Sequence, residues 1–452
     1  MAERRETNMI KALRAFITDR PGFLGKLLTT IGNCGGNIGD LRLIKRGSRH
    51  NFRELEIYVS SEEHMEEILH TVGQLDGIQI DSVNDVVLEV HRGGKIEMVS
   101  KTPIIDPGDL RKIYTPGVAE VCKQIQREPE TYWDFTFAKN SVAIVTNGTA
   151  ILGLGNIGAK AGMPVMEGKA VLFAELVGLS GIPLLVHSED PAEVVKIVSN
   201  ISETFGAIQL EDFAAPACFQ IEKQLQEKLN IPVMHDDQHG TAVVTLAALM
   251  NATRYSGESL KLQKVGIVGL GAAGMGIAKL LKAYGVKVIT GSDINPEANE
   301  LFEQDVGPTC NLEELMKSST VVVATTGVPQ LISPKLVQPR QIILALSNPN
   351  PEITPEDATE AGAAFAADGR GVNNALAFPG IFKGALSARA TRITNHMKIA
   401  AATTLSEYAN RSRQDLVPAL MNKKVHKAIS DAVEKAAYES GVVRVIKPAE
   451  SI

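Results

Sequence analysis

Four carboxylates gather in one short stretch of the chain, residues 210–241. Glu211 and Asp212 stand near its start, and Asp236 and Asp237 stand near its end. Apolar residues recur at helical spacing over 217–229, and the apolar run that follows predicts a short buried strand. Because a helix that returns into a strand can bring its ends together, we expect the two acidic pairs to meet. Two like charges about 4 Å apart repel by roughly 4 kcal/mol at an effective dielectric near 20, so such a cluster needs a cation.

The chemistry of these ligands favours one class of metal. Oxygen ligands without a dense set of Cys and His suit Mg²⁺ or Mn²⁺ better than Zn²⁺. His235 and His239 have the spacing of a zinc pair on a helix, but no third soft ligand follows them and Gly240 argues against a helix there. A solvated acidic loop, with Glu211 and Asp212 at a helix N-terminus, explains the same residues without a metal. The spacing alone leaves the metal site and the solvated loop open.

Two further residues could take part in catalysis. Tyr114 lies in a Y-T-P-G-V-A stretch, and Lys169 follows P-V-M-E-G. Lys169 would begin an apolar helix over 170–179, where a cation opposes the helix dipole, and this position predicts a somewhat lowered pKa for its amine. A surface lysine that extends its amine into water is the simpler explanation for Lys169 taken alone.

Composition limits the kinds of protein to consider. The chain has 452 residues, 44% of them hydrophobic and 22% charged, which is an ordinary globular composition with room for about two or three domains. A net charge of -6 without a basic block argues against a nucleic-acid partner. The four cysteines are scattered and form no C-x-x-C pair, so no disulfide framework is indicated. No signal peptide and no membrane-spanning apolar run are found, so we expect a cytoplasmic protein without a membrane partner.

Residues 8–90 form a unit with its own pattern. Predicted strands and helices follow in the order β-α-β-β-α-β, which is the ferredoxin-like split unit. The D-R-P-G-F-L-G-K-L stretch from Asp19 and the loop 35–37 resemble the ACT domain, a module that senses small molecules. That resemblance implies pairing of copies edge to edge and a small acid or amino acid as effector. An oligomerisation unit without a ligand is the alternative.

The second of two G-x-G-x-x-G sequences has the context of a dinucleotide site. A strand over 264–268 precedes it, a helix over 275–284 and a strand over 286–290 follow, and Asp293 stands about 20 residues beyond the last glycine. Asp293 would bond the ribose 2′-hydroxyl and repel a 2′-phosphate, which favours NAD over NADP, although it could instead cap a turn. The residues expected to bind the cofactor in this loop are Gly269, Gly271, Ala272, Ala273 and Gly274.

The first G-x-G-x-x-G sequence, 153–158, has a different context. Gly162 and Pro164 follow within a few residues and leave no room for a helix that could receive a pyrophosphate. We therefore interpret this sequence as a tight turn near the site.

Amide side chains stand after two later segments. Strands are predicted over 320–324 and 341–346, and Asn348 lies in the turn after the second. Asn373 and Asn374 form a polar island near 371–380. Amides can bond a substrate carboxylate, and they form turns equally well. Beyond Thr391 two helices are predicted, one reaching residue 408 and one over 422–438.

From about Lys101 to its end, the chain resembles the malic enzymes of the short bacterial type. The matching motifs, in chain order, are Y-T-P-G-V-A, N-G-T-A-I-L-G-L-G-N-I-G, P-V-M-E-G-K, L-E-D-F-A-A-P, H-D-D-Q-H-G-T-A, the nucleotide glycines, S-N-P and V-N-N-A-L-A-F-P-G. The resemblance implies an α/β fold in three parts. These are the ACT-like unit over 8–90, a substrate and metal domain over 95–242, and a Rossmann-type NAD-binding domain with C-terminal helices over 243–452.

The resemblance also implies an activity, the oxidative decarboxylation of (S)-malate to pyruvate and CO₂ with reduction of NAD. Mg²⁺ or Mn²⁺ would be held by Glu211, Asp212 and Asp237. Lys169 would accept the proton of the malate hydroxyl, and Tyr114 would protonate the enolate. Asp236 would orient Lys169 or a metal ligand. Asn348 and Asn374 would hold malate, and Asn348 would also lie near the cofactor. Asn373 is a weaker candidate for a substrate contact.

One departure from the family and two rival functions stay open. The longer eukaryotic branch has an arginine where Ala150 stands, so the group that balances a substrate carboxylate here is not identified. One rival is a malolactic-type or decarboxylating enzyme that uses NAD without net release of NADH. The other is a sensing protein whose catalytic half has decayed, which the intact Tyr114 and Lys169 disfavour. We expect a homodimer or a higher homo-oligomer.

Overall fold

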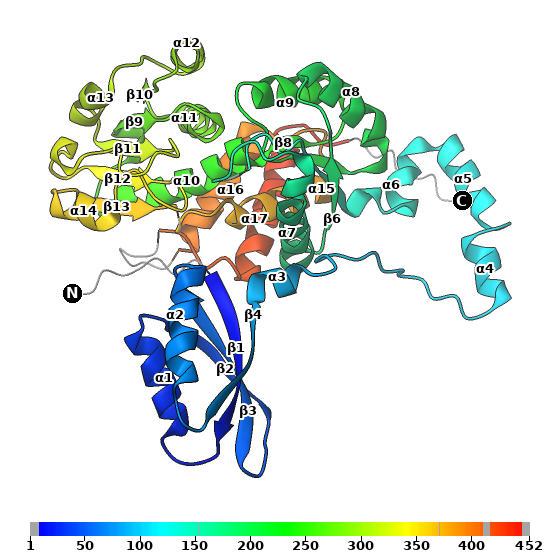
Figure 1. Ribbon diagram of the computed structural model, residues 1–452. Coiled ribbons are helices and arrows are strands. Elements are labelled where there is room, and N and C mark those ends of the chain that lie inside the picture. The colour runs from blue at the N-terminus through cyan, green and yellow to red at the C-terminus, as the bar shows by residue number, and fades with distance from the viewer. Residues whose placement is uncertain (1–8, 152, 370, 410–415, 445–452) are drawn as a thin grey trace. The chain divides into compact units, whose positions relative to one another are not determined.

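The computed structural model describes residues 9–151, 153–369, 371–409 and 416–444 (Figure 1). The chain forms two compact units, Met1–Glu97 and Met98–Ile452. The predicted domain ends at residue 8 and beyond residue 444 lie outside the described residues, and so does Leu152, just before the first glycine sequence.

The first unit is a four-stranded antiparallel sheet in the order β2-β3-β1-β4, with α1 and α2 on one face (Figure 1). This arrangement confirms the predicted β-α-β-β-α-β order, whereas the ACT resemblance stays a prediction. The core between helices and sheet includes Leu27, Ile31 and Ile68. The elements are β1 (Met9–Thr18), α1 (Phe23–Asn33), β2 (Asn37–Lys45), β3 (His50–Val59), α2 (Glu62–Gly73), β4 (Ile78–Asp85) and the short α3 (Val86–His91).

The second unit contains two parallel sheets, of which the first has the order β6-β5-β7-β8. The strand order reverses between β5 and β7, which makes the carboxyl ends of these strands the expected place for a ligand. Its elements are β5 (Ser141–Thr146), α7 (Ala159–Val177), β6 (Ser180–Leu185), α8 (Pro191–Ile201), β7 (Ala207–Leu210), α9 (Ala217–Lys228) and β8 (Val233–His235).

Helix α7 corrects the interpretation of the first glycine sequence. The helix begins directly after Gly158 and continues through Gly162 and Pro164, where none was expected. A proline near a helix start removes a single backbone donor, and the buried face of α7, which includes Met166 and Phe173, packs against the sheet. Packing therefore outweighs the local signals. Lys169 consequently lies within the helix rather than at its start.

Helix α10 (Asp236–Tyr255) corrects the expectation for Gly240. The helix runs through Gly240, and glycine suits this position because any Cβ there would overlap Asp236 Oδ1. Fifteen of the twenty residues of α10 are buried, as in a helix that crosses a protein core. The predicted domain boundary between 242 and 243 falls inside this helix.

The second sheet has the order β10-β9-β11-β12-β13 and is parallel throughout. This is a doubly wound, Rossmann-type order that reverses between β9 and β11, as the sequence predicted. The strands β10, β11 and β12 match predicted ones, and β13 was not predicted. The elements are β9 (Lys264–Val268), α11 (Ala272–Tyr284), β10 (Val288–Ser292), α12 (Pro296–Asp305), α13 (Leu312–Ser318), β11 (Val321–Ala324), β12 (Ile342–Ala345), α14 (Pro355–Glu360) and β13 (Phe365–Asp368).

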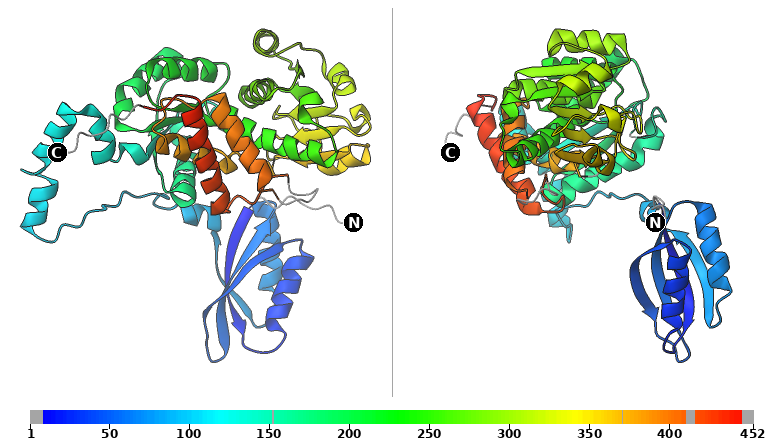
Figure 2. Two further views of the ribbon diagram at one scale, coloured as in Figure 1. Left: turned by 180° about the vertical axis from the view of Figure 1, so that it is seen from behind. Right: turned by 90° about the vertical axis from the view of Figure 1, so that its left-hand side faces the viewer.

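After the second sheet the described chain continues with α15 (Phe378–Ser387), α16 (Asn395–Glu407) and α17 (Lys423–Glu439). Helices α16 and α17 lie side by side (Figure 2). Both confirm predicted helices, whereas α15 was not predicted, because its start at Phe378 overlaps a segment interpreted as a turn. Among the described residues, no helix is both long and apolar enough to cross a membrane.

Candidate active site

Strands β7 and β8 deliver both acidic pairs to one edge of the first sheet. Glu211 and Asp212 follow β7, and Asp236 and Asp237 open α10 directly after β8. Because neighbouring parallel strands end at the same edge, the pairs converge. One carboxylate oxygen each from Glu211, Asp212 and Asp237 lie within 4.8 Å of one another. The structure thus brings together the three carboxylates that the sequence analysis grouped.

The local geometry of this acidic cluster suits a hard cation. The backbone N–H of Asp212 donates to Asp237 Oδ2 at 2.9 Å, and Gln209 Nε2 donates to Glu211 Oε2 at 2.6 Å. Asp212 Oδ2 and Asp236 Oδ1 are buried and have no hydrogen-bond partner among the described residues. Buried, unpartnered oxygens are costly unless something compensates for them, and a divalent cation bound by oxygen ligands would do so.

The electrostatics of the cluster point the same way. Burial, the largest cause, raises the pKa of Glu211 to about 7 and that of Asp212 to about 8, and the charge of Asp237 raises both. Burial also raises the pKa of Asp237 to about 6 and that of Asp236 to about 7. Strongly perturbed carboxylates at a sheet edge are typical of a functional site rather than of a solvated acidic loop.

Lys169 reaches this cluster from α7. Its Nζ lies 2.6 Å from Asp236 Oδ2, 3.0 Å from Glu211 Oε1 and 4.6 Å from the centre of the Phe378 ring. The side chain is 11% exposed, so it is not a surface lysine. Burial lowers the pKa of Lys169, but the charges of Asp236 and Glu211 outweigh it and raise that pKa above its usual range. The lowered pKa expected from the helix dipole is therefore wrong for the metal-free chain.

The glycine loop after β9 has the form that a pyrophosphate requires. Gly269 has a φ of 88°, in the left-handed region, and a Cβ on Gly274 would overlap Gly269 O. No atom lies within 4 Å of the position that a Cβ on Gly271 would take, so the start of α11 is open to a ligand. Ala272 and Ala273 form the first turn of that helix, where backbone N–H groups can bind phosphate.

Comparison with known proteins identifies the family. The model of the malic enzyme N-terminal domain matches residues 93–226, and that of the malic enzyme NAD binding domain matches residues 294–438. A third match, over residues 231–330, overlaps the second and is to the NAD binding domain of D-isomer specific 2-hydroxyacid dehydrogenases. The chain is 52% identical to NAD-dependent malic enzyme 1 of Bacillus subtilis, over 95% of this chain and 98% of that protein. The chain belongs to the malic enzyme family.

Two more relatives bear on the fold and the function. A bifunctional malic/malolactic enzyme of Bacillus subtilis is 42% identical, over 82% of this chain and 97% of its own length. The crystal structure of malic enzyme from Pyrococcus horikoshii superposes with a TM-score of 0.76 at 38% identity and covers 80% of this chain and 92% of its own. The malic-enzyme fold of the second unit is thereby shown.

In this malic-enzyme fold, Asp293 meets its predicted role as a turn cap, and its position is compatible with the predicted ribose contact. Its Oδ2 accepts from the N–H of Leu270 in the glycine loop at 2.7 Å, and its Oδ1 accepts from the N–H of Asn295 at 2.8 Å. The carboxylate therefore caps a turn and stands at the carboxyl end of β10, beside the loop, where a ribose is bound in such folds. The ribose contact itself stays a prediction.

Replacing Asp293 by serine is expected to shift the ratio of kcat/KM for NAD over NADP toward NADP by about tenfold, or ~1.4 kcal/mol. The cause is the loss of charge repulsion against a 2′-phosphate. Steady-state kinetics with both cofactors measure the ratio. Asp293→Asn, which keeps an acceptor for Leu270 and loses the charge, separates electrostatics from loop disorder. A wild-type enzyme that already prefers NADP would contradict the role.

The three predicted asparagines differ in their placement. Asn374 lies beside the first turn of α10. Its Cβ is 3.2 Å from the position that a Cβ on Gly240 would take. Asn373 Oδ1 accepts from the N–H of Ala375 at 2.9 Å, so this amide is a turn former. Asn348 follows β12 at the carboxyl edge of the second sheet. Of the three asparagines, Asn374 is thus the one that the contacts of the described residues place beside the helix turn carrying Asp236 and Asp237.

Tyr114 is not brought to Lys169 within the described chain. It is 66% exposed and ends α4 (Pro107–Ile113), which is followed by α5 (Val118–Arg127) and α6 (Tyr132–Phe135). Eight large apolar side chains of the same segment, residues 104–137, are also exposed in the described chain, and we refer to them together as the apolar surface around Tyr114. They are Ile104, Ile105, Leu110, Ile113, Val118, Val121, Phe135 and Phe137.

Sequence reasoning missed a hydrogen-bonded group of buried residues beside the acidic cluster, of which it considered only His239, as a candidate zinc ligand. Glu222 on α9, His239 on α10 and Lys398 on α16 are joined by hydrogen bonds. Burial alone would raise the pKa of Glu222, but His239 and the charge of Lys398 lower it to about 2, so this carboxylate is ionised. A signal was present: position 222 lies on the stripe of α9 that buries Cys218, Ile221 and Leu225, where a carboxylate needs a partner.

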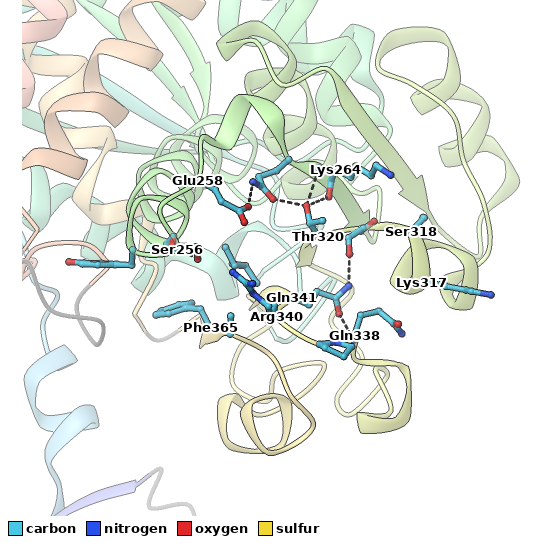
Figure 3. Close-up of a pocket in the computed structure, with 17 residues that line it drawn as sticks. Ser256, Glu258, Lys264, Lys317, Ser318, Thr320, Gln338, Arg340, Gln341 and Phe365 are labelled. Carbon is cyan, nitrogen blue, oxygen red and sulfur yellow. Dashed lines mark hydrogen bonds between the residues drawn. The ribbon is translucent and has the colours of Figure 1, made fainter.

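A cavity of about 660 Å³ opens at the edge of the second sheet where its strands begin, opposite the edge that carries the glycine loop (Figure 3). Thr320, Ile342 and Phe365 line it at the amino ends of β11, β12 and β13, together with Arg340. It contains none of the predicted site residues, and ligands of parallel α/β sheets bind at the carboxyl ends of the strands. The acidic cluster and the glycine loop therefore stay the candidate active site.

Proposed function

We propose that the chain oxidatively decarboxylates (S)-malate to pyruvate and CO₂ with reduction of NAD, in the presence of Mg²⁺ or Mn²⁺. The observation that carries the proposal is the Lys169 amine, held 2.6 Å from Asp236 and 3.0 Å from Glu211 beside a cluster of three convergent carboxylates. Membership of the malic enzyme family supports the same reaction. The test is the formation of NADH, pyruvate and CO₂ from (S)-malate, and its loss in EDTA.

Each residue has a part in this scheme. Glu211, Asp212 and Asp237 would hold the divalent cation, which when bound supplies Lewis-acid chemistry toward the substrate oxygens. Lys169 accepts the C2 hydroxyl proton while hydride passes from C2 to the nicotinamide. The C3–C4 bond then breaks to release CO₂, and Tyr114 donates a proton to C3. Asp236 keeps the lysine amine aimed at the substrate. The two positive charges of the cation would offset the carboxylates that raise the pKa of Lys169, as a base at this position requires.

The proposal needs a route by which Tyr114 reaches the substrate. The apolar surface around Tyr114 favours a second copy of the chain, because exposed patches of this kind mark interfaces. The segment of one copy would then complete the site of another.

Mixing two inactive variants tests this arrangement. Tyr114→Phe and Lys169→Ala chains, unfolded together and refolded, should regain activity, because hybrid assemblies contain one site with both residues intact. Each variant refolded alone is the control. If light scattering shows a monomer, or if the mixture stays as inactive as its parts, Tyr114 does not act across copies.

A malolactic reaction is the second candidate, favoured by the likeness to the bifunctional malic/malolactic enzyme. In that reaction malate becomes lactate and CO₂, and the NADH formed is used again. Measuring NADH and lactate in one assay separates the two functions. Lactate without accumulation of NADH would favour the malolactic candidate.

We further propose that the first unit binds a small amino or carboxylic acid. A cavity of about 350 Å³ includes Asp19, Arg20 and Gly22 of the predicted region, together with Asn51 and Arg53. Gly22 is the residue just before α1 and provides no side-chain cap, so backbone N–H groups at the start of this helix can bind a carboxylate. The two arginines suit the same group, and Asp19 suits an ammonium. The loop 35–37, also predicted to contact the ligand, is not among the lining residues.

An acid bound there is expected to change the affinity for malate by about 5–150-fold, or 1–3 kcal/mol. Amino and carboxylic acids can be screened by calorimetry and by malate kinetics on the full chain. A truncated chain that begins at Gly94 is the comparison. If the truncated chain shows the same assembly and the same effector response, regulation by the first unit is excluded.

A further inference from the structure

A buried carboxylate on α9 holds the segment that carries Asp236 and Asp237. Glu222 is 6% exposed. Its Oε1 accepts from the backbone N–H of His235 at 2.9 Å, and its Oε2 accepts from Gln238 Nε2 at 3.2 Å. Glu222 therefore bonds to the residue before the two aspartates and to the residue after them.

Two further contacts extend this arrangement on the side of α16. His239 Nε2 lies 3.0 Å from Glu222 Oε2, and Lys398 Nζ lies 3.0 Å from His239 Nδ1. An ammonium has only donors, so Nδ1 of this histidine accepts and its Nε2–H donates to Glu222. Lys398 is itself 6% exposed and supplies a buried positive charge near the carboxylate.

On the other side, the contacts end at a proposed metal ligand. Gln238 Nε2, a donor, lies 3.2 Å from His235 Nδ1, so the proton of this ring is on Nε2. That Nε2 lies 3.2 Å from Asp237 Oδ2, although the angle is not that of a hydrogen bond. The ring therefore limits where the Asp237 carboxylate can move.

We propose that Glu222 is a positioning residue, with Lys398 as its counter-charge, and that it holds Asp236 and Asp237 in place for the metal. Stability alone does not explain the group, because apolar residues often replace buried ion pairs without loss of stability. The carboxylates of the cluster repel one another, so a fixed support is required to keep them convergent before a cation binds. The inference rests on the metal centre of the proposed function.

Titration of the full chain with Mn²⁺ alone, followed by electron paramagnetic resonance of the free ion, tests the proposal. Glu222→Gln is expected to raise the Mn²⁺ dissociation constant by about 10–100-fold, the usual effect of losing an outer partner of a metal ligand. Saturating Mn²⁺ should restore kcat toward the wild-type value, which general structural damage would not allow. Circular dichroism and thermal unfolding in EDTA check the fold.

Glu352→Gln is the matched control. Glu352 is also fully buried, but it accepts from the N–H of Thr326 at 2.6 Å and from Ser347 Oγ at 2.5 Å, in the turns after β11 and β12. Its Mn²⁺ dissociation constant should equal that of the wild type. A rise as large as in Glu222→Gln would overturn the proposal.

The outcomes separate the inference from the function beneath it. If the wild type binds Mn²⁺ and a folded Glu222→Gln binds it equally well, the inference alone fails. If the wild type binds no Mn²⁺, the metal centre and the inference both fail. Should Glu222→Gln not fold, Lys398→Met decides, since a folded Lys398→Met chain with unchanged Mn²⁺ affinity would overturn the proposal.

Discussion

Replacing Lys169 by alanine is expected to lower kcat for malate oxidation by about 10²–10⁴-fold, the usual cost of a lost acid or base. The amine is buried and lies 2.6 Å from Asp236, at the cluster of carboxylates. Single-turnover formation of NADH measures the step directly. Lys160→Ala, an exposed lysine on the same helix, is the control and should keep wild-type activity.

Tyr114→Phe separates the two proton transfers in the same scheme. Protonation of the enolate should become slow, while hydride transfer from malate and decarboxylation of added oxaloacetate stay detectable. A Tyr114→Phe chain that still turns over malate at the wild-type rate would remove the acid role. If Lys169→Ala also oxidises malate at the wild-type rate, the assignment of both residues is wrong.

Replacing Asp237 by asparagine is expected to raise the Mn²⁺ dissociation constant by more than the ~10–100-fold that a lost outer partner costs, because a charged ligand is removed. The fold should persist, since an amide oxygen can still accept from the N–H of Asp212. Calorimetric titration measures the affinity. Asp431→Asn, an exposed partner of Lys427, is the control.

The same variant should be more stable than the wild type in EDTA. Burial raises the pKa of Asp237 to about 6, so above that pH the folded state holds a buried ionised carboxylate at a cost in free energy. The unfolded state has no such cost, and stability is therefore lost as pH rises through the folded pKa. A neutral amide removes this penalty. Unchanged Mn²⁺ affinity together with unchanged stability in EDTA would contradict the place of Asp237 in the cluster.

Part of the site could be predicted because it depends on short-range order. Glu211, Asp212 and Asp237 each follow an apolar run that is short enough for a parallel strand, and such strands end at one edge. Helix α7 and the start of α10 could not be predicted in this way, because Pro164 and Gly240 are local interruption signals that tertiary packing overrides.

Contacts between distant segments were beyond the reach of local patterns. Lys398 meets His239 across 159 positions, and no periodicity records how α16 packs on α10. The raised pKa of Lys169 likewise depends on Glu211 and Asp236, which follow β7 and β8, and not on the position of Lys169 in α7. The exposed Tyr114 shows a further limit, since a motif reveals a residue type and not the surface that the residue will meet.

Helix α10 begins with Asp236, the partner of Lys169, and with the proposed ligand Asp237. It contacts the nucleotide helix α11 through Gly276, where a side chain would overlap the backbone of Gln238. Twenty helical residues extend about 30 Å, and fifteen of them are buried. One buried helix thus connects the acidic cluster with the helix that follows the glycine loop. We therefore expect the fold itself, rather than a loop, to set the distance between the two parts of the candidate site.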